Sequence, residues 1–299
     1  HEFVFHPKDA ISKVNKLIEN TDFLFNDWST LPMLMLSEKV SSEVKVVLSG
    51  DGGDEFFFGY AKYFQLLNLK EYSHITSHIF KYAAKFFNQS KFAYFKRLTY
   101  SLDYRASLQS AANAEMLINE LAQFHGEIIN DVLFNSYQKK FYSSDEKGPK
   151  DFSKMMQLAD VNGYLRNNIL PKVDRSTMAY GLEAREPLLD YRLLLYTMSV
   201  PQRKLGISAP GKLPLIEKLQ NELPTYRVGA KRGFSVPMRD WMRNELREFV
   251  RDNIAAQKFR SSQDILSLTN IDYYIDNFFK NNIGNPRFIW GIVLYSCWL

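Results

Sequence analysis

Apolar residues recur at helical spacing near the start of the chain. The pattern at 7–21, with a proline at the first helical position, predicts an amphipathic helix, and a second helix is expected at 31–41. Residues 1–5 are typical of a β-strand entered halfway, which indicates that an upstream segment precedes this sequence. The chain therefore opens as a strand followed by two helices.

A short apolar run at 44–48 is rich in β-branched residues, as expected of a parallel strand buried on both faces. A glycine-rich turn follows it, and a helix is expected to start at about Asp54. Beyond Tyr60 the pattern changes to long aromatic-rich helical stretches at about 73–100 and 116–142, and no strand is expected there. The second half of the chain is thus predicted to be a helical layer.

Composition places the chain among ordinary folded, soluble proteins. Its 299 residues, 45% hydrophobic and 24% charged, allow one or two domains. The formal charge of +5 comes from scattered lysines and arginines without a basic run, so an anionic small substrate accounts for it and a nucleic-acid partner is not expected.

The single cysteine, Cys297, excludes an intrachain disulfide and a thiolate metal cluster. The longest apolar run, at 288–299, is too short to cross a bilayer, and the first residues do not form a signal peptide. We therefore expect a cytoplasmic location and no membrane partner.

The segment 48–55, Leu-Ser-Gly-Asp-Gly-Gly-Asp-Glu, carries the clearest chemistry. Its backbone N–H groups are expected to converge on an anion, with glycines that let a phosphate approach closely. The carboxylates of Asp51, Asp54 and Glu55 are suited to Mg²⁺ held between protein and phosphates. The alternative is a tight glycine turn in which Asp54 caps a helix.

The same segment, followed by Phe57, Gly59 and Tyr60, resembles a signature of the asparagine synthetase family. Three more elements of that family occur in order along the chain. They are the Asp-x-Ser-x-x-Pro element at 27–32, the block Lys-Val-Asp-Arg-Ser-Thr-Met-Ala at 172–179 continued by Gly-Leu-Glu-Ala-Arg-Glu-Pro-Leu-Leu-Asp at 181–190, and Lys-Arg-Gly-Phe-Ser-Val-Pro at 231–237. The resemblance runs through almost the whole chain.

The resemblance implies an α/β fold: part of an adenine nucleotide alpha hydrolase-like (PP-loop) parallel-sheet core merged with a larger all-helical portion. Residues 1–66 would be the C-terminal part of the nucleotide-binding core, and 67–299 the helix-rich remainder that completes the active site. The implied reaction uses ATP and Mg²⁺. A carboxylate, by default that of aspartate, attacks the α-phosphate of ATP, and ammonia from a glutaminase domain then displaces AMP to form an amide. A homodimer is compatible with the resemblance.

Site residues follow from the matching motifs. Ser49, Gly50, Gly52 and Gly53 would bind ATP, Asp54 would contact Mg²⁺, and Asp51 would lie near the adenylate. Carboxylate and α-phosphate repel each other, so a cation must hold them in line, and Lys231 is predicted for this role.

Glu183 would accept a proton from the attacking ammonia, although a plain ion pair with Arg185 or Arg175 is an equal alternative. Asp174 and Arg175 are predicted to form an internal supporting pair, and Arg185 is predicted as a further supporting residue.

The sequence also departs from the family pattern. The Ser-Gly-Gly-x-Asp-Ser loop and the glutaminase segment of the family do not occur in it, which predicts a fragment with weak nucleotide binding and no glutamine-dependent activity by itself. Phe58 replaces a usual glycine, and a bulky ring there is expected to narrow the pocket or to repack the following helix. Other carboxylate acceptors, such as a sugar uronate, and a non-catalytic scaffold are the alternative readings.

Overall fold

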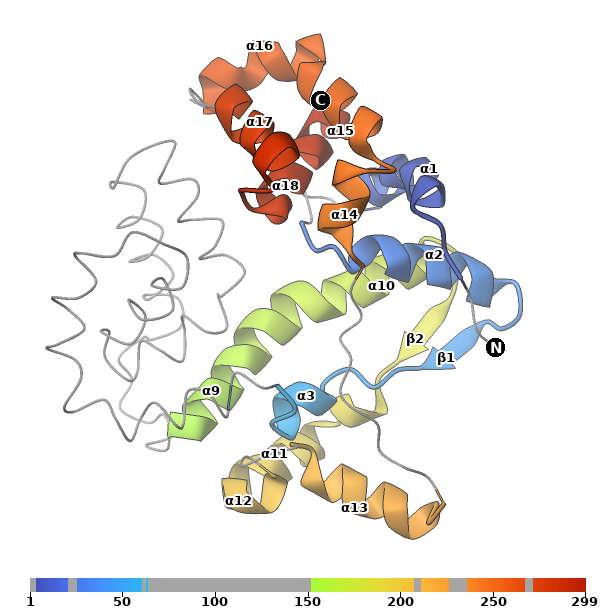
Figure 1. Cartoon of the computed structure of the whole chain (residues 1–299). Helices are drawn as coiled ribbons and strands as arrows, with labels where there is room; N and C mark the ends of the chain where they lie inside the picture. The colour runs from blue at the N-terminus through green and yellow to red at the C-terminus, as the bar shows by residue number, and fades with distance from the viewer. Residues whose placement is uncertain are drawn as a thin grey trace, which may run out of the picture.

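The structure is a computed structural model that describes residues 4–20, 26–60, 63, 152–206, 211–225, 236–266 and 271–299, shown in Figure 1. The helices predicted at about 73–100 and 116–142 lie outside this part of the chain, as does the predicted catalytic residue Lys231.

The two N-terminal helices are confirmed as α1 (Pro7–Glu19) and α2 (Thr30–Ser41). Pro7 occupies the first turn of α1, where its missing N–H costs nothing. The expected strand at 1–5 is wrong for the residues that can be described. Val4 and Phe5 have no regular structure, and Val4 is 78% exposed. In the part of the chain that the structure describes, these two residues pair with no strand.

A parallel two-stranded sheet joins distant parts of the chain. Strand β1 (Val46–Leu48) pairs with β2 (Glu183–Arg185) so that Val46 lies opposite Glu183 and Leu48 opposite Arg185. The strand predicted at 44–48 is therefore confirmed, but its burial on both faces is wrong, because Leu48 is 74% exposed.

Strand β2 corrects the expectation that no strand follows Tyr60. Its three residues, two of them charged, carry no apolar pattern, and only pairing with β1 makes them a strand. The predicted division at 66/67 stays a prediction, and the sheet takes one strand from each side of it.

The described second half is otherwise helical, as predicted. Helix α9 (Phe152–Asp160), the π-helical segment η1 (Val161–Ile169) and α10 (Leu170–Met178) follow one another without a break and form the long helix in the middle of Figure 1. The other helices are the 3₁₀ turn η2 (Pro187–Leu189), α11 (Tyr191–Ser199), α12 (Gln202–Leu205), α13 (Leu213–Glu222), α14 (Met238–Arg243), α15 (Arg247–Ala255), α16 (Gln257–Leu266), α17 (Ile271–Asn281) and α18 (Pro286–Trp298).

Two apolar clusters hold these elements together. The larger one packs α1 and α2 against α14, α15, α17 and α18, with Trp290 fully buried in it. The smaller one joins the four-residue helix α3 (Gly53–Phe56) to η1, α10 and α12 through Phe56, Phe57 and Phe58. The glycine-rich loop thus rests on a packed base. None of the helices in the described part of the chain is both long and apolar enough to cross a membrane.

Candidate active site

The glycine-rich loop begins where β1 ends and is tied to β2 from its first residue. The N–H of Ser49 donates to the carbonyl of Arg185 at 2.9 Å. The Ser49 hydroxyl donates to Asp51 Oδ2 at 2.7 Å, so that two predicted site residues hold each other. Because the carboxyl ends of adjacent parallel strands lie at one edge of a sheet, the segments after β1 and β2 are brought together here.

The glycines of the loop serve different purposes. A Cβ added at Gly50 would meet no heavy atom of the described residues within 4 Å, so this position is open to a ligand. A Cβ at Gly52, where φ is +85°, would lie 2.2 Å from Leu189 Cδ2, and one at Gly53 would lie 2.9 Å from Leu188 Cδ1. The expected positive φ is found at Gly52, and the lack of a side chain at both positions lets η2 pack against the loop. Their role in ATP binding stays a prediction.

The acidic residues after the glycines already have partners. Asp54 Oδ1 lies 3.0 Å from Lys212 Nζ, a residue that sequence reasoning did not single out. Glu55 is 1% exposed and accepts a hydrogen bond from the Tyr60 hydroxyl. Burial raises the pKa of Glu55, against the lowering effect of that hydrogen bond. Glu55 faces the protein interior, so the expectation that it offers an oxygen to Mg²⁺ is wrong.

The alternative in which Asp54 caps the following helix is wrong. Helix α3 begins at Gly53 and its N-cap is Gly52, so Asp54 lies inside the first turn and is not the cap. Among the described residues, no group of three or more His, Cys, Asp or Glu side chains is placed to hold a metal.

Strand β2 presents an exposed ion pair. Arg185 Nε donates to Glu183 Oε1 at 2.7 Å, and this hydrogen bond lowers the pKa of the Glu183 carboxyl. The ion-pair alternative for Glu183 is thus observed, with Arg185 as the partner. Both side chains are more than half exposed, at 55% and 61%, and the pair contributes little to stability.

The predicted Asp174–Arg175 pair is not among the ion pairs of the described ranges. Arg175 Nη1 donates instead to the carbonyl of Asn20 at 3.2 Å, which ties α10 to the end of α1. Asp174 is exposed, and its charge acts on Glu186 at the carboxyl end of β2.

Glu186 is a candidate that sequence reasoning missed. Burial raises the pKa of its carboxyl, and the negative charges of Asp51 and Asp174 raise it further. A carboxyl with a raised pKa beside other acids is the usual setting of a general acid or base. The signal was its position directly after Leu-Glu-Ala-Arg, one residue beyond β2.

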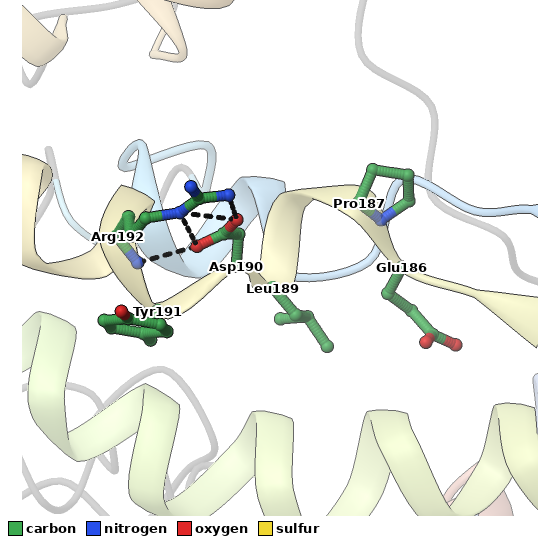
Figure 2. Close-up of a pocket in the computed structure, with 6 residues that line it drawn as sticks. All are labelled: Glu186, Pro187, Leu189, Asp190, Tyr191 and Arg192. Carbon is green, nitrogen blue, oxygen red and sulfur yellow. Dashed lines mark hydrogen bonds and ion pairs between the residues drawn. The ribbon is translucent and has the colours of Figure 1, made fainter.

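A shallow hollow of about 670 Å³ lies along the segment that follows β2, and Figure 2 shows the residues around it. Asp190 caps α11 by accepting a hydrogen bond from the backbone N–H of Arg192 at 2.9 Å, and its carboxylate also accepts a hydrogen bond from the Arg192 guanidinium. These bonds lower the Asp190 pKa to about 2. None of the predicted site residues lines the hollow, whose walls are Glu186, Pro187, Leu189, Asp190, Tyr191 and Arg192.

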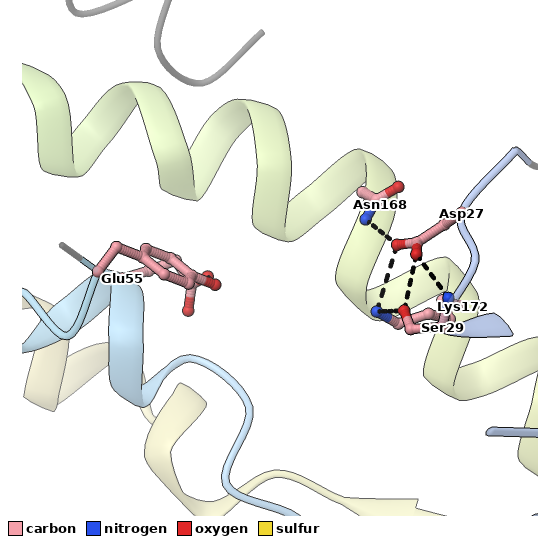
Figure 3. A network of polar contacts seen from close by, with 6 residues as sticks. Asp27, Ser29, Glu55, Asn168 and Lys172 are labelled. Carbon is pink, nitrogen blue, oxygen red and sulfur yellow. Dashed lines mark hydrogen bonds and ion pairs between the residues drawn. The ribbon is translucent and has the colours of Figure 1, made fainter. Parts of the chain in front are cut away.

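A second polar network connects two of the sequence motifs, as Figure 3 shows. Asp27 Oδ2 accepts from Asn168 Nδ2 at 2.7 Å and lies 3.4 Å from Lys172 Nζ, which also donates to Ser29 Oγ at 2.8 Å. Burial alone would raise the pKa of Asp27, but the charge of Lys172 and the hydrogen bonds from Ser29 and Asn168 lower it. The network fixes the start of α2 on η1 and α10.

Comparison with known proteins gives consistent matches. A family model described as Asparagine synthase matches residues 1–294. Asparagine synthetase (glutamine-hydrolyzing) 1 of Bacillus subtilis strain 168 is 25% identical over 318 residues, which cover 99% of this chain and 46% of that protein. A putative asparagine synthetase (glutamine-hydrolyzing) of Mycobacterium tuberculosis strain H37Rv is 26% identical over 281 residues, covering 91% of this chain and 42% of that protein.

The chain therefore spans less than half the length of these relatives. A shorter match, 37% identical over 81 residues, links a quarter of the chain to asparagine synthetase (glutamine-hydrolyzing) 1 of Arabidopsis thaliana. No solved structure matches the chain significantly.

Proposed function

Since the chain belongs to the asparagine synthase family, we propose that it takes part in the ATP-dependent conversion of a carboxylate to an amide. Aspartate is the proposed acceptor and ammonia the nitrogen donor. The named relatives are described as glutamine-hydrolyzing, and we propose glutamine as the source of that ammonia.

The observation that carries this proposal is the parallel pairing of β1 and β2. It brings the loop 49–53 and the residues after Arg185 to one edge of the sheet, where α/β proteins bind their ligands. No heavy atom of the described residues lies within 4 Å of a Cβ placed at Gly50, and the Asp51 and Glu186 carboxyls lie near enough for their charges to interact. This proximity of motifs far apart in the sequence supports the proposal that they form one site.

The proposed reaction has two steps. An oxygen of the acceptor carboxylate bonds to the α-phosphorus of ATP while the bond to pyrophosphate breaks. Ammonia then bonds to the acyl carbon, the carbon–oxygen bond breaks, AMP leaves, and a proton passes from nitrogen to a base. The chain must hold the acceptor carboxylate and the α-phosphate in line for this attack, although both are negatively charged. We propose that Ser49 and the backbone at Gly50 orient the phosphate, and that Lys231 supplies the balancing positive charge.

Two carboxylates compete for the role of proton acceptor. Glu183 was predicted from the sequence, but its hydrogen bond with Arg185 lowers its pKa and weakens it as a base. The Glu186 pKa is raised, which brings it closer to neutral pH and makes it the stronger base. We propose Glu186 as the acceptor, with Glu183 positioning Arg185.

The described residues do not fit a dedicated magnesium site. Asp54 neutralises Lys212, Asp51 accepts from Ser49, and Glu55 faces the core. Mg²⁺ often needs only one or two carboxylates besides phosphates and water, so Asp54 stays a predicted contact that a metal would have to share with Lys212. No step above depends on the metal.

Phe58 gives no support for an altered acceptor. Its ring is fully buried and packs edge-to-face on Tyr63 at 5.1 Å between centroids, so it lies in the core. The two effects expected for it stay predictions. Aspartate remains the proposed acceptor, and the other carboxylates are outcomes of the test.

The test is release of AMP and pyrophosphate from MgATP in the presence of ammonia, with and without aspartate. The chain should be assayed alone and with any sequence that its gene encodes ahead of it. Aspartate-dependent release of both products supports the proposal. Release that ignores aspartate indicates another carboxylate, and the absence of turnover in every mixture favours a non-catalytic scaffold.

A further inference from the structure

Lys212, just before α13, contacts both ends of the short helix α3. Its ammonium lies 3.0 Å from Asp54 Oδ1 in the first turn, and its backbone N–H donates to the carbonyl of Phe57 at 2.8 Å. Lys212, which is distant in the sequence, therefore contacts α3, the helix that follows the glycine-rich loop, at two points.

The backbone around these contacts is unusual. Phe58 and Lys212 both adopt the left-handed region, with φ of +55° and +54°, which side chains other than glycine rarely occupy. Such conformations persist only where the surrounding structure holds them, and they cluster at functional sites. A glycine would adopt this φ without strain, whereas Phe58 does not.

Two glycines complete the contact. A Cβ at Gly211 would lie 2.4 Å from the carbonyl oxygen of Phe58, and a Cβ at Gly59 would lie 1.9 Å from Asp54 Oδ1 and 2.4 Å from Lys212 Cε. The ion pair thus lies directly on Gly59, and the chain at 211–212 lies directly on the turn at 57–59. We name this set of contacts, made by Asp54, Phe57, Phe58, Gly59, Gly211 and Lys212, the clasp.

Lys212 approaches the loop from its packed side. A Cβ at Gly53 would be surrounded by Leu188, Lys212 and Leu215, with Lys212 Nζ at 3.7 Å, whereas the open position is Gly50. The ion pair is also sheltered, since the Lys212 and Asp54 side chains are 33% and 24% exposed. This placement suits a residue that affects a bound ligand by holding the loop, without contacting the ligand itself.

We propose that Lys212 is a positioning residue: the clasp that it closes keeps residues 49–53 in the single conformation in which they meet a nucleotide. The identity of that ligand rests on the proposed function, but the effect of Lys212 on the loop does not. Because the lysine both neutralises Asp54 and holds the turn, loss of its charge should loosen the loop without unfolding the chain.

The first test measures hydrogen exchange in the ligand-free full chain. In the Lys212→Met variant, the amides of Phe56, Phe57 and Gly59, which bond within this segment at 2.8–3.2 Å, should exchange at least about tenfold faster. Lys212→Arg should restore slow exchange. The matched control is Lys218→Met, which removes an exposed lysine of α13 that pairs with Glu222, and it should leave the loop unchanged.

Asp54→Asn removes the same ion pair from the other side and should loosen the same amides, and adding Lys212→Met to it should change little more. Unchanged exchange in both single variants would overturn the proposal. Faster exchange that extends to α18 in both would indicate general destabilisation and would overturn it as well.

The second test is the MgATP affinity of the same variants. Lys212→Met should weaken binding about tenfold while Lys218→Met binds as the wild type does. Wild-type affinity in a Lys212→Met chain with a loosened loop would contradict the positioning role. If the wild-type chain, assayed together with any sequence that its gene encodes ahead of it, binds no nucleotide, the proposed function fails, and the exchange result still decides whether Lys212 holds the loop.

Discussion

Replacing Lys172 by Met should destabilise the chain far more than removing a lysine from a shorter but more exposed ion pair. The Lys172 and Asp27 side chains are only 11% and 14% exposed. Removing one partner of a buried pair costs roughly 3–5 kcal/mol, because the other charge is left without compensation. Asp27 keeps its hydrogen bonds from Ser29 and Asn168, which places the expected loss near the lower end, at about 3 kcal/mol.

Lys13→Met is the control. Lys13 Nζ lies 2.6 Å from Glu38 Oε1, closer than the 3.4 Å between Lys172 and Asp27, but its side chains are 21% and 37% exposed. Solvent screening limits such a pair to about 1 kcal/mol or less. Distance alone would predict the opposite order of the two variants, so the comparison separates burial from proximity.

Urea unfolding of the three proteins, followed by circular dichroism at pH 7, measures the two losses. A series from pH 7 to pH 3 adds a second check. The pKa of Asp27 in the folded chain lies below its ordinary value of 3.8, so its stabilisation is fully present above about pH 4 and is lost as the pH falls further. The difference between wild type and Lys172→Met should therefore shrink in acid. Equal losses for the two variants, or a difference that does not change with pH, would refute this reasoning.

Three further predictions concern the loop, the proton acceptor and the cysteine. Gly52→Ala should lower the free energy of unfolding by about 2–4 kcal/mol, because its Cβ would meet Leu189 and the backbone at this position is left-handed. Gly50→Ala should leave the free energy of unfolding unchanged but weaken nucleotide binding, as measured by calorimetry. Glu186→Gln should lower the rate of amide formation by about 10²–10⁴ and abolish the fall in rate that occurs as the pH drops through the raised pKa of Glu186. Glu183→Gln should keep that pH dependence. The reverse result would make Glu183 the proton acceptor. Burial raises the pKa of Cys297 to about 11, so iodoacetamide at pH 8 should alkylate the folded chain on the order of 100-fold more slowly than the urea-unfolded chain, and equal rates would contradict its burial.

Local signals predicted the parts of the fold that depend on local structure. The apolar spacing after Pro7 was sufficient for α1, and the β-branched run was sufficient for β1, because periodicity and propensity act over a few neighbouring residues. Strand β2 was missed because Glu-Ala-Arg has no strand pattern and forms a strand only through its long-range partner.

The sequence predicted the site residues that lie in a motif, but not those whose role depends on tertiary packing. Ser49 and Asp51 were found and lie in contact, yet the reason for glycine at Gly52 is a leucine far along the chain. Lys212 lies in no recognised motif, so its contacts with the loop appear only in three dimensions. The sequence shows that Phe58 replaces a usual glycine, but it does not reveal that Phe58 has a left-handed backbone conformation.

The most direct test of the proposed chemistry follows the oxygen atoms of the acceptor. Aspartate labelled with ¹⁸O in its side-chain carboxylate is incubated with MgATP and ammonia, and the products are separated and weighed by mass spectrometry. An acyl-adenylate requires one carboxylate oxygen to leave with the α-phosphorus, so the AMP formed should carry one ¹⁸O atom. Label in inorganic phosphate with unlabelled AMP would show that the carboxylate attacks a different phosphorus and would contradict the proposed reaction.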